Sequence, residues 1–318
     1  MTPATPSPNT TDFRSKEFRF SSFFFTGVTG LATYLIIALL AVVLVNVVIH
    51  GWPGLSWHFV STIPKKDVFD PATTGILPMI VGTTIRVILM TIFVVPVGVI
   101  TAVYLTEYAH NTSRLTRVIR TAVNNLAGVP SVVFGLFGLG FFINFVGHHL
   151  DLLLNNGEKA WGQPSLIWAS LTLAVMTLPV VIVATEEALK SVPQGLREAS
   201  LALGATKLKT IIKIVLPQAL PGILTGGILA VSRAAGEVAP ILFTGVAYYM
   251  SSLPTHLTDQ FMDLGYHVFV LSTQSPNIDQ TQPILYATVL VLLILTFALN
   301  IVAILVRSRM RRNQRSLH

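Results

Sequence analysis

Arg233 and Glu237 stand four residues apart inside a long apolar stretch of this 318-residue sequence. On a helix this spacing places both side chains on one face, where they can form an ion pair. An arginine at bilayer depth costs about 2.5–3.5 kcal/mol on insertion scales, so such a residue usually has a function. The forked donors of a guanidinium match phosphate-like oxygens, and a neighbouring carboxylate keeps binding weak enough for release. Two roles remain open: a binding point for an oxyanion, or a structural bridge that fixes helix register.

Arg86 is the second arginine within an apolar stretch, about ten residues from the end that we predict to face outward. It could contact the same anion nearer the entrance. It could equally extend its aliphatic stem so that the charged group reaches the membrane surface. The sequence leaves both roles open.

Enzyme chemistry has no candidate residues. The chain has no cysteine, which excludes disulfides and thiolate chemistry. No nucleotide-binding G-x-x-x-x-G-K-[ST] motif occurs, because Gly204-Ala205-Thr206-Lys207 lacks the preceding glycine. The neighbouring His148 and His149 are interpreted as an interfacial pair rather than a metal site. We therefore predict no catalytic residue, no metal, no cofactor and no enzymatic activity.

The composition indicates a membrane protein. The chain is 52% apolar and only 11% charged, whereas soluble domains carry about 25% charged residues. A helix needs about 20 apolar residues to cross a bilayer, because its backbone must be satisfied internally. Six stretches qualify: Val28–Ile49, Ile76–Tyr104, Val118–Val146, Ser165–Ala184, Leu220–Ala247 and Pro283–Val306. The predicted fold is all-α, with six transmembrane helices.

The basic residues predict the orientation. Most of the 21 Lys and Arg residues fall in four regions on one side: the N-terminal tail, the loop after the second span, the segment between the fourth and fifth spans, and the C-terminal tail. The opposite side has Lys65, Lys66 and Lys159. Both termini are therefore predicted to be cytoplasmic. The basic C-terminus is read as an anchor on anionic lipid, not as a nucleic-acid site, and the first apolar run as an uncleaved anchor.

Arg233 lies about 13 residues from either end of the predicted fifth span, roughly 20 Å along the helix, which predicts a position near the midplane. On the neighbouring strip four small residues recur at i+4 spacing, a pattern that lets helices approach closely. They are Gly222, Gly226, Ala230 and Ala234.

The segment between the fourth and fifth spans predicts a short helix near residues 193–204. Ser191 and Pro193 are typical of a helix start, and Gly204 is typical of a left-handed cap after the end. Leu196, Ala199 and Leu203 form a narrow apolar stripe. Thr206 is expected to cap a second helix that runs to Leu216. The first helix suits a groove on a soluble partner, although it could also be a connector that lies on the membrane or packs on its own bundle.

Glu198-Ala199-Ser200, followed by Gly204 and later by Leu216-Pro217, resembles the E-A-A…G…L-P signature of ABC importer permeases. The resemblance implies the type I permease architecture and identifies this segment with the coupling helix that contacts the ATPase subunit. The residues expected at that contact are Leu196, Glu198, Ala199, Ser200, Leu203 and Gly204.

Further motifs resemble the phosphate-specific branch of these importers, and its A-type inner-membrane permease subunit in particular. They include Gly82-Thr83-Thr84, the run from Gly128 to Leu139, and Ser232 to Pro240, in which Val238 stands where the family commonly has Thr. The resemblance implies inward translocation of inorganic phosphate along a path that includes Arg233, Glu237 and Arg86. It implies as partners a homologous second permease, two ATP-binding subunits and an extracytoplasmic phosphate-binding protein. The alternatives are another oxyanion, molybdate or sulfate, or a self-sufficient secondary transporter.

The expected organisation has five segments. A cytoplasmic tail occupies 1–20, a first transmembrane anchor 21–50, an outer loop 51–75, the permease core 76–306 and a basic cytoplasmic tail 307–318. The outer loop Tyr248–Gln282 holds Asp259, Asp263 and Asp279 without Lys or Arg, and its stretch Thr255–Phe269 reads as amphipathic. This stretch could close the pathway or contact the binding protein.

Overall fold

The computed structural model describes residues 20–64, 68–69, 74–110, 113–154 and 156–315, with side chains from Phe24 to Met310 in those ranges. It divides into two compact units, Met1–Val48 and Ile49–His318, which are described separately. The first unit contains most of α1 (Phe20–Gly51), whose large apolar side chains, such as Leu31 and Ile36, are exposed. A helix that is apolar all round requires apolar surroundings, so α1 suits a membrane anchor.

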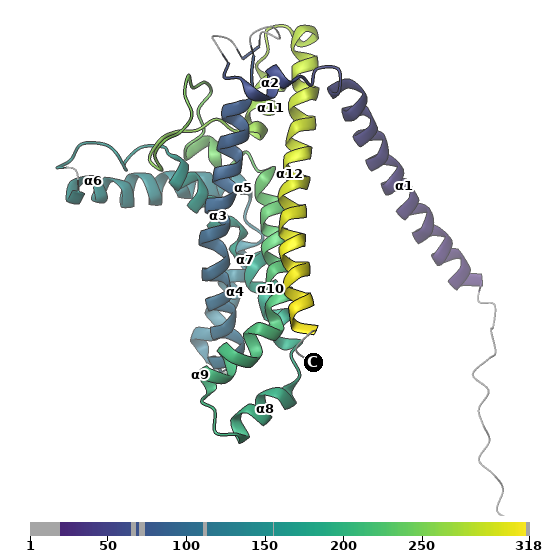
Figure 1. Ribbon diagram of the computed structural model, residues 1–318, viewed down its shortest axis with the longest axis vertical. Helices are drawn as coiled ribbons and strands as arrows, with labels where there is room; N and C mark the ends of the chain where they lie inside the picture. The colour runs from purple at the N-terminus through teal and green to yellow at the C-terminus, as the bar shows by residue number, and fades with distance from the viewer. Residues whose placement is uncertain (1–19, 65–67, 70–73, 111–112, 155, 316–318) are drawn as a thin grey trace, which may run out of the picture. The chain divides into compact units, whose positions relative to one another are not determined.

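Four long helices form the centre of the second unit: α3 (Leu77–Val103), α7 (Leu166–Lys190), α10 (Leu216–Ala235) and α12 (Ile278–Arg315). The central helix is α7, which packs against both α3 and α10, while α12 packs against α10 (Figure 1). One hydrophobic core joins α3, α7 and α10 and includes Met90, Leu173 and Ala230.

The contact between α7 and α10 depends on small side chains. A Cβ atom at Gly222 would clash with the Cβ of Ala188, and one at Gly226 would lie 2.8 Å from the Cβ of Ala184. Ala230 and Ala234 continue the same row and are fully buried. The close approach predicted from the row of small residues is confirmed.

The other elements are shorter: α2 (Trp57–Ser61), η1 (Tyr104–Tyr108), α4 (Arg114–Leu126), α5 (Ser131–Phe137), η2 (Gly138–Gly147), α6 (His148–Leu154), α8 (Gln194–Ala202), α9 (Lys207–Thr210), η3 (Ile211–Val215), η4 (Ile241–Phe243) and α11 (Leu264–Thr273). Within the second unit, α8 and α9 lie at one end of the long helices and α2 and α11 at the other (Figure 1). The π-helical η1 continues α3 without a break. Similarly, η2 joins α5 to α6, and η3 joins α9 to α10.

The predicted all-α class is confirmed, since the described residues contain an isolated bridge between Val246 and Phe261 but no strand. Six helices are long and apolar enough to cross a membrane, in agreement with the predicted number. Four of them match the predicted bounds to within about six residues, and the other two are displaced by more than ten residues at one end or both.

The predicted third span, Val118–Val146, is wrong. The chain breaks between α4, which ends at Leu126, and α5, which begins at Ser131. Pro130 lies in the break, and a proline removes a backbone donor and holds its predecessor out of the helical conformation. Because α4 is amphipathic, the stretch with the length and composition of a span is Ser131–Leu154.

The predicted fifth span, Leu220–Ala247, is also wrong. The helix ends at Ala235 with Gly236 as its cap, and it extends back through η3 and α9 to Lys207. The helix expected between Thr206 and Leu216 therefore does not stop before Pro217. The π-helical turn of η3 ends at Val215, two residues before that proline, and such turns let a helix continue where its regular hydrogen bonding is interrupted.

Two further boundaries differ from the prediction. Within the predicted amphipathic stretch Thr255–Phe269, helix begins only at Leu264. The C-terminal tail is not separate from the last span, because α12 continues to Arg315. Residues 1–19, 65–67 and 316–318, among them Lys65 and Lys66, lie outside the described residues. The side on which the termini lie stays a prediction.

Candidate functional site

Arg233 lies in the last turn of α10, and Glu237 lies just beyond the end of that helix. The Nε of Arg233 is 3.5 Å from the Oε1 of Glu237. The Arg233 side chain is 42% exposed and that of Glu237 is 23% exposed. The two residues thus form the expected pair. Because the pair is partly open and joins neighbours in the chain, it leaves donors of the guanidinium accessible to an anion.

The C-terminal end of α10 contacts turns of α3 and α12 that lie well away from the ends of those two helices. Ser232 donates a hydrogen bond of 2.7 Å to the side-chain oxygen of Asn300, well inside α12. The main-chain oxygen of Ala234 accepts a bond from Arg86, nine residues after the start of α3. The sequence argument for the depth of Arg233 assumed a helix that extends equally on both sides, and this assumption is wrong. Its depth is instead defined by these contacts with α3 and α12.

Arg86 is completely buried and paired with a carboxylate. Its Nη2 lies 2.8 Å from the Oδ2 of Asp263. Its Nη1 donates to the main-chain oxygen of Ala234 at 3.0 Å, and Nη2 to that of Ala235 at 3.5 Å. The last carbonyls of a helix have no intrahelical partner and carry partial negative charge. Arg86 therefore caps α10 beside Arg233, and its head group does not extend to a surface.

Asp263 links α11 to α3, a role that the sequence did not predict. Its Oδ1 accepts bonds from the amides of Gly265 and Tyr266 and so caps the start of α11. Its Oδ2 accepts from the hydroxyl of Thr83 at 2.9 Å as well as from Arg86. The signal available in the sequence was the charge of Arg86, since a buried charge needs a partner. Three aspartates of the outer loop were equal candidates for that partner.

The predicted amphipathic helix near residues 193–204 is α8, with Pro193 as its N-cap. Ser191 does not start it but ends α7, where its hydroxyl donates to Ala188. Gly204 has φ of +82°, the left-handed conformation that its place after the helix predicted. Leu203 is 89% exposed. A leucine of this exposure is not packed on the same bundle.

The other residues expected at the coupling contact divide between the surface and the fold. Leu196, Glu198 and Ala199 are exposed. Ser200 instead faces its own chain, and its hydroxyl lies 2.9 Å from that of Thr210.

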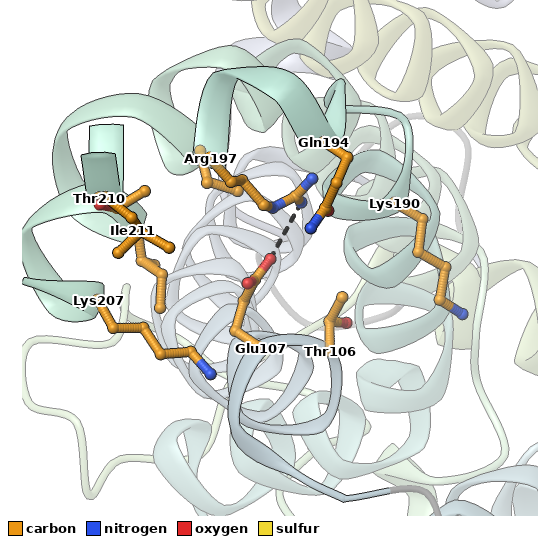
Figure 2. Close-up of a pocket in the computed structure, with 10 residues that line it drawn as sticks. Thr106, Glu107, Lys190, Gln194, Arg197, Lys207, Thr210 and Ile211 are labelled. Atoms are coloured by element: carbon orange, nitrogen blue, oxygen red, sulfur yellow. Dashed lines mark hydrogen bonds and ion pairs between the residues drawn. The ribbon is translucent and has the colours of Figure 1, made fainter. Parts of the chain in front are cut away.

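Arg197 attaches α8 to the rest of the unit. Its guanidinium donates to the main-chain oxygens of Val192 at 2.6 Å and Leu189 at 2.7 Å, and to the carboxylate of Glu107 at 3.1 Å. A pocket of about 490 Å³ lies beside this ion pair. Figure 2 shows Arg197 and Glu107 pointing toward each other across it, with Thr106 and Gln194 nearby. The sequence did not predict this attachment.

A bundle of apolar helices, with an exposed and capped helix between two of its spans, is the arrangement expected of a membrane permease of the importer type. The chain belongs to the family of binding-protein-dependent transport system inner membrane components, whose model matches residues 94–312. It is accordingly a multi-pass inner-membrane protein and the permease subunit of an ABC importer. This architecture implies ATP-binding subunits and a substrate-binding protein as partners, and it disfavours a self-sufficient secondary transporter.

Several curated relatives share this family. The probable ABC transporter permease protein YqgI of Bacillus subtilis is 36% identical over 69% of this chain and 68% of its own length. Phosphate transport system permease protein PstA 1 of Mycobacterium tuberculosis is 36% identical over 76% of this chain and 72% of its own length. PstA of Yersinia pestis is 32% identical over 80% and 84%.

Solved importers share the fold. A bacterial alginate ABC transporter in complex with its periplasmic protein aligns with a TM-score of 0.60 at 13% identity, over 92% of this chain and 95% of that one. The MetNI methionine ABC transporter in inward-facing form aligns with a TM-score of 0.52 at 20% identity, over 74% and 94%. At these identities they support the fold alone.

Proposed function

We propose that this chain is the permease subunit through which an ABC importer moves inorganic phosphate into the cytoplasm. The observation that carries the proposal is the partly exposed ion pair of Arg233 and Glu237 at the C-terminal end of α10. The phosphate transport permeases among its relatives support phosphate as the anion, in preference to molybdate or sulfate. The assembly would contain a homologous second permease, two ATP-binding subunits and an extracytoplasmic phosphate-binding protein.

In this proposal Arg233 binds the anion transiently and Glu237 limits the strength of binding. The guanidinium offers forked donors to phosphate oxygens. The carboxylate 3.5 Å away competes for the same donors, so the anion is held weakly enough to leave. A structural bridge between helices is the weaker interpretation, because both partners belong to one short segment.

Arg86 contributes to this path by holding the end of α10. Its ion pair with Asp263 and its bonds to Ala234 and Ala235 engage Nη1 and Nη2, whereas Nε is buried without a hydrogen-bond partner among the described residues. The direct anion contact predicted from the sequence would require the Asp263 pair to open. We therefore assign Arg86 to positioning Arg233.

The exposed face of α8 is proposed to dock on an ATP-binding subunit through Leu196, Glu198, Ala199 and Leu203, while Gly204 sets the turn that follows. Ser200 supports this face from behind through Thr210. The orientation with both termini and α8 in the cytoplasm follows from the distribution of basic residues.

The test is radiolabelled uptake into vesicles that contain the complete reconstituted complex, with phosphate, sulfate and molybdate compared directly. Phosphate should be taken up, and Arg233→Gln should abolish its flux. The double variant Arg233→Met with Glu237→Leu should remain inactive, whereas a purely structural pair would tolerate this apolar replacement. Preferred uptake of sulfate or molybdate, or transport by the double variant, would reject the assignment.

A further inference from the structure

The helix formed by α3 and η1 has one ion pair near each end. It runs from Leu77 to Tyr108, and its charged residues are Arg86 and Glu107. Arg86 pairs with Asp263 and caps the end of α10. Glu107 pairs with Arg197 of α8. One continuous helix thus connects the neighbourhood of Arg233 with the helix proposed to dock on the ATPase.

The Glu107–Arg197 pair is shielded from solvent. The side chains are 10% and 14% exposed, and their charged atoms are 3.1 Å apart. The remaining bonds of Arg197 go to carbonyls of Leu189 and Val192 at the end of α7. A guanidinium can make these bonds together because its donors form a rigid fork. Arg197 therefore joins α8, the end of α7 and η1 at a single point.

The body of α8 packs on α9 and η3 rather than on α3. The pocket of about 490 Å³ separates these elements around the ion pair, as Figure 2 shows. The bond between Arg197 and Glu107 therefore gives a displacement of α8 a direct route to η1, in addition to the route through α9 and η3 into α10.

The connecting helix packs against α7 along much of its length. Pro96 interrupts its hydrogen bonding, but Gly98 lies so close to α7 that an added Cβ would be 2.6 Å from Val181. Such packing restrains bending at the proline. Rigid elements with defined contacts at both ends are physical carriers of coupling between sites.

We propose that α3 with η1 transmits motion of α8 to the end of α10, and that Glu107 and Arg197 are the positioning residues that couple the two. This inference rests on the proposed docking of α8. ATP-driven displacement of α8 pulls on Glu107, the helix shifts, and Arg86 moves the carbonyls of Ala234 and Ala235 and with them Arg233. Without the Glu107–Arg197 bond, ATP hydrolysis continues but less phosphate is imported per ATP hydrolysed.

The experiment measures phosphate imported per ATP hydrolysed in the full reconstituted complex. Glu107→Gln removes the paired charge but leaves Arg197 bonded to Leu189 and Val192. Arg197→Lys keeps a cation but loses the fork, and it provides the test if the first variant does not assemble. Each should lower the ratio about fivefold or more, the lower range of energetic coupling between sites. The double variant should lose no more than either single one.

Two further variants separate the possible failures. Lys190→Gln is the matched control, because Lys190 borders the same pocket but pairs with Glu186 within α7, and it should keep the wild-type ratio. Glu198→Lys tests the docking of α8 itself, because it reverses a charge on the exposed face proposed to dock. A wild-type ratio in Glu107→Gln and Arg197→Lys, with a low ratio in Glu198→Lys, would overturn the role of α3 and leave the docking intact. A wild-type ratio in Glu198→Lys as well would reject the docking, and this inference with it.

Discussion

Arg86 donates a hydrogen bond from Nη1 to the main-chain oxygen of Ala234 at 3.0 Å, one residue after Arg233. The same guanidinium is neutralised by Asp263 at 2.8 Å, and both side chains are fully buried. A buried charge is tolerated when it is paired and hydrogen-bonded. The two arginines of the apolar spans therefore differ in role: Arg86 fixes the main chain of α10, and Arg233 faces the proposed path.

Replacing Asp263 should destabilise the protein strongly. Asp263→Ala leaves the Arg86 charge buried without its partner, and breaking a buried pair in this way costs about 3–5 kcal/mol. The midpoint of thermal unfolding of the purified complex should fall, together with the yield of folded protein. The control is Asp259→Ala, because the side chain of Asp259 is 34% exposed and its carboxylate accepts hydrogen bonds from Thr255 and His256 of its own loop. An unchanged midpoint in Asp263→Ala would contradict the pairing described here.

Replacing two glycines of α10 by alanine should change the stability of the protein in opposite directions. Gly222→Ala places a methyl group against Ala188 of α7, and such overpacking costs about 1–3 kcal/mol. At Gly227 the nearest atom to an added Cβ is 3.5 Å away on Val95, an ordinary contact. Gly227→Ala should stabilise by up to about 1 kcal/mol, because alanine favours the helix. Thermal unfolding of both variants checks the contrast, and equal midpoints would argue against close packing of α7 on α10.

Gly204 should accept asparagine better than valine. An added Cβ meets no atom within 4 Å there, so the restriction comes from φ of +82° alone. A left-handed conformation costs about 1–2 kcal/mol for most residues, but Asn adopts it more readily. Phosphate uptake should therefore fall less in Gly204→Asn than in Gly204→Val. Gly195→Ala, an exposed glycine of α8 with open space and no positive φ, should behave as wild type.

The stability of the protein should fall at acidic pH through His267. This residue lies in α11, outside the candidate spans, and burial lowers its pKa from 6.5 to about 3. Between these values the unfolded chain takes up a proton that the folded chain does not, so stability decreases as pH falls below 6.5, by about 1 kcal/mol per pH unit. His267→Gln should flatten this dependence in unfolding measured from pH 7 to 5. An equally steep decline in the variant would assign the effect to other groups.

Local patterns predicted much of this structure. The apolar stretches gave the number of candidate spans, and the glycine after α8 marked its end, because both signals act over a few residues. The breaks at Pro130 and Gly236 were missed, since apolar composition continues across them. The bonds of Asp263 to Arg86 and of Glu107 to Arg197 join residues far apart in the chain, and no local pattern selects such partners.

Arg86 holds the backbone of α10 and not the side chains at positions 233 and 237. In the proposed path, the residue that anchors the helix is therefore separate from the residues that bind the anion. An engineered permease for another anion could be sought by varying those two positions alone, with the scaffold beneath them unchanged. Replacements at position 86 would instead disturb every cargo alike.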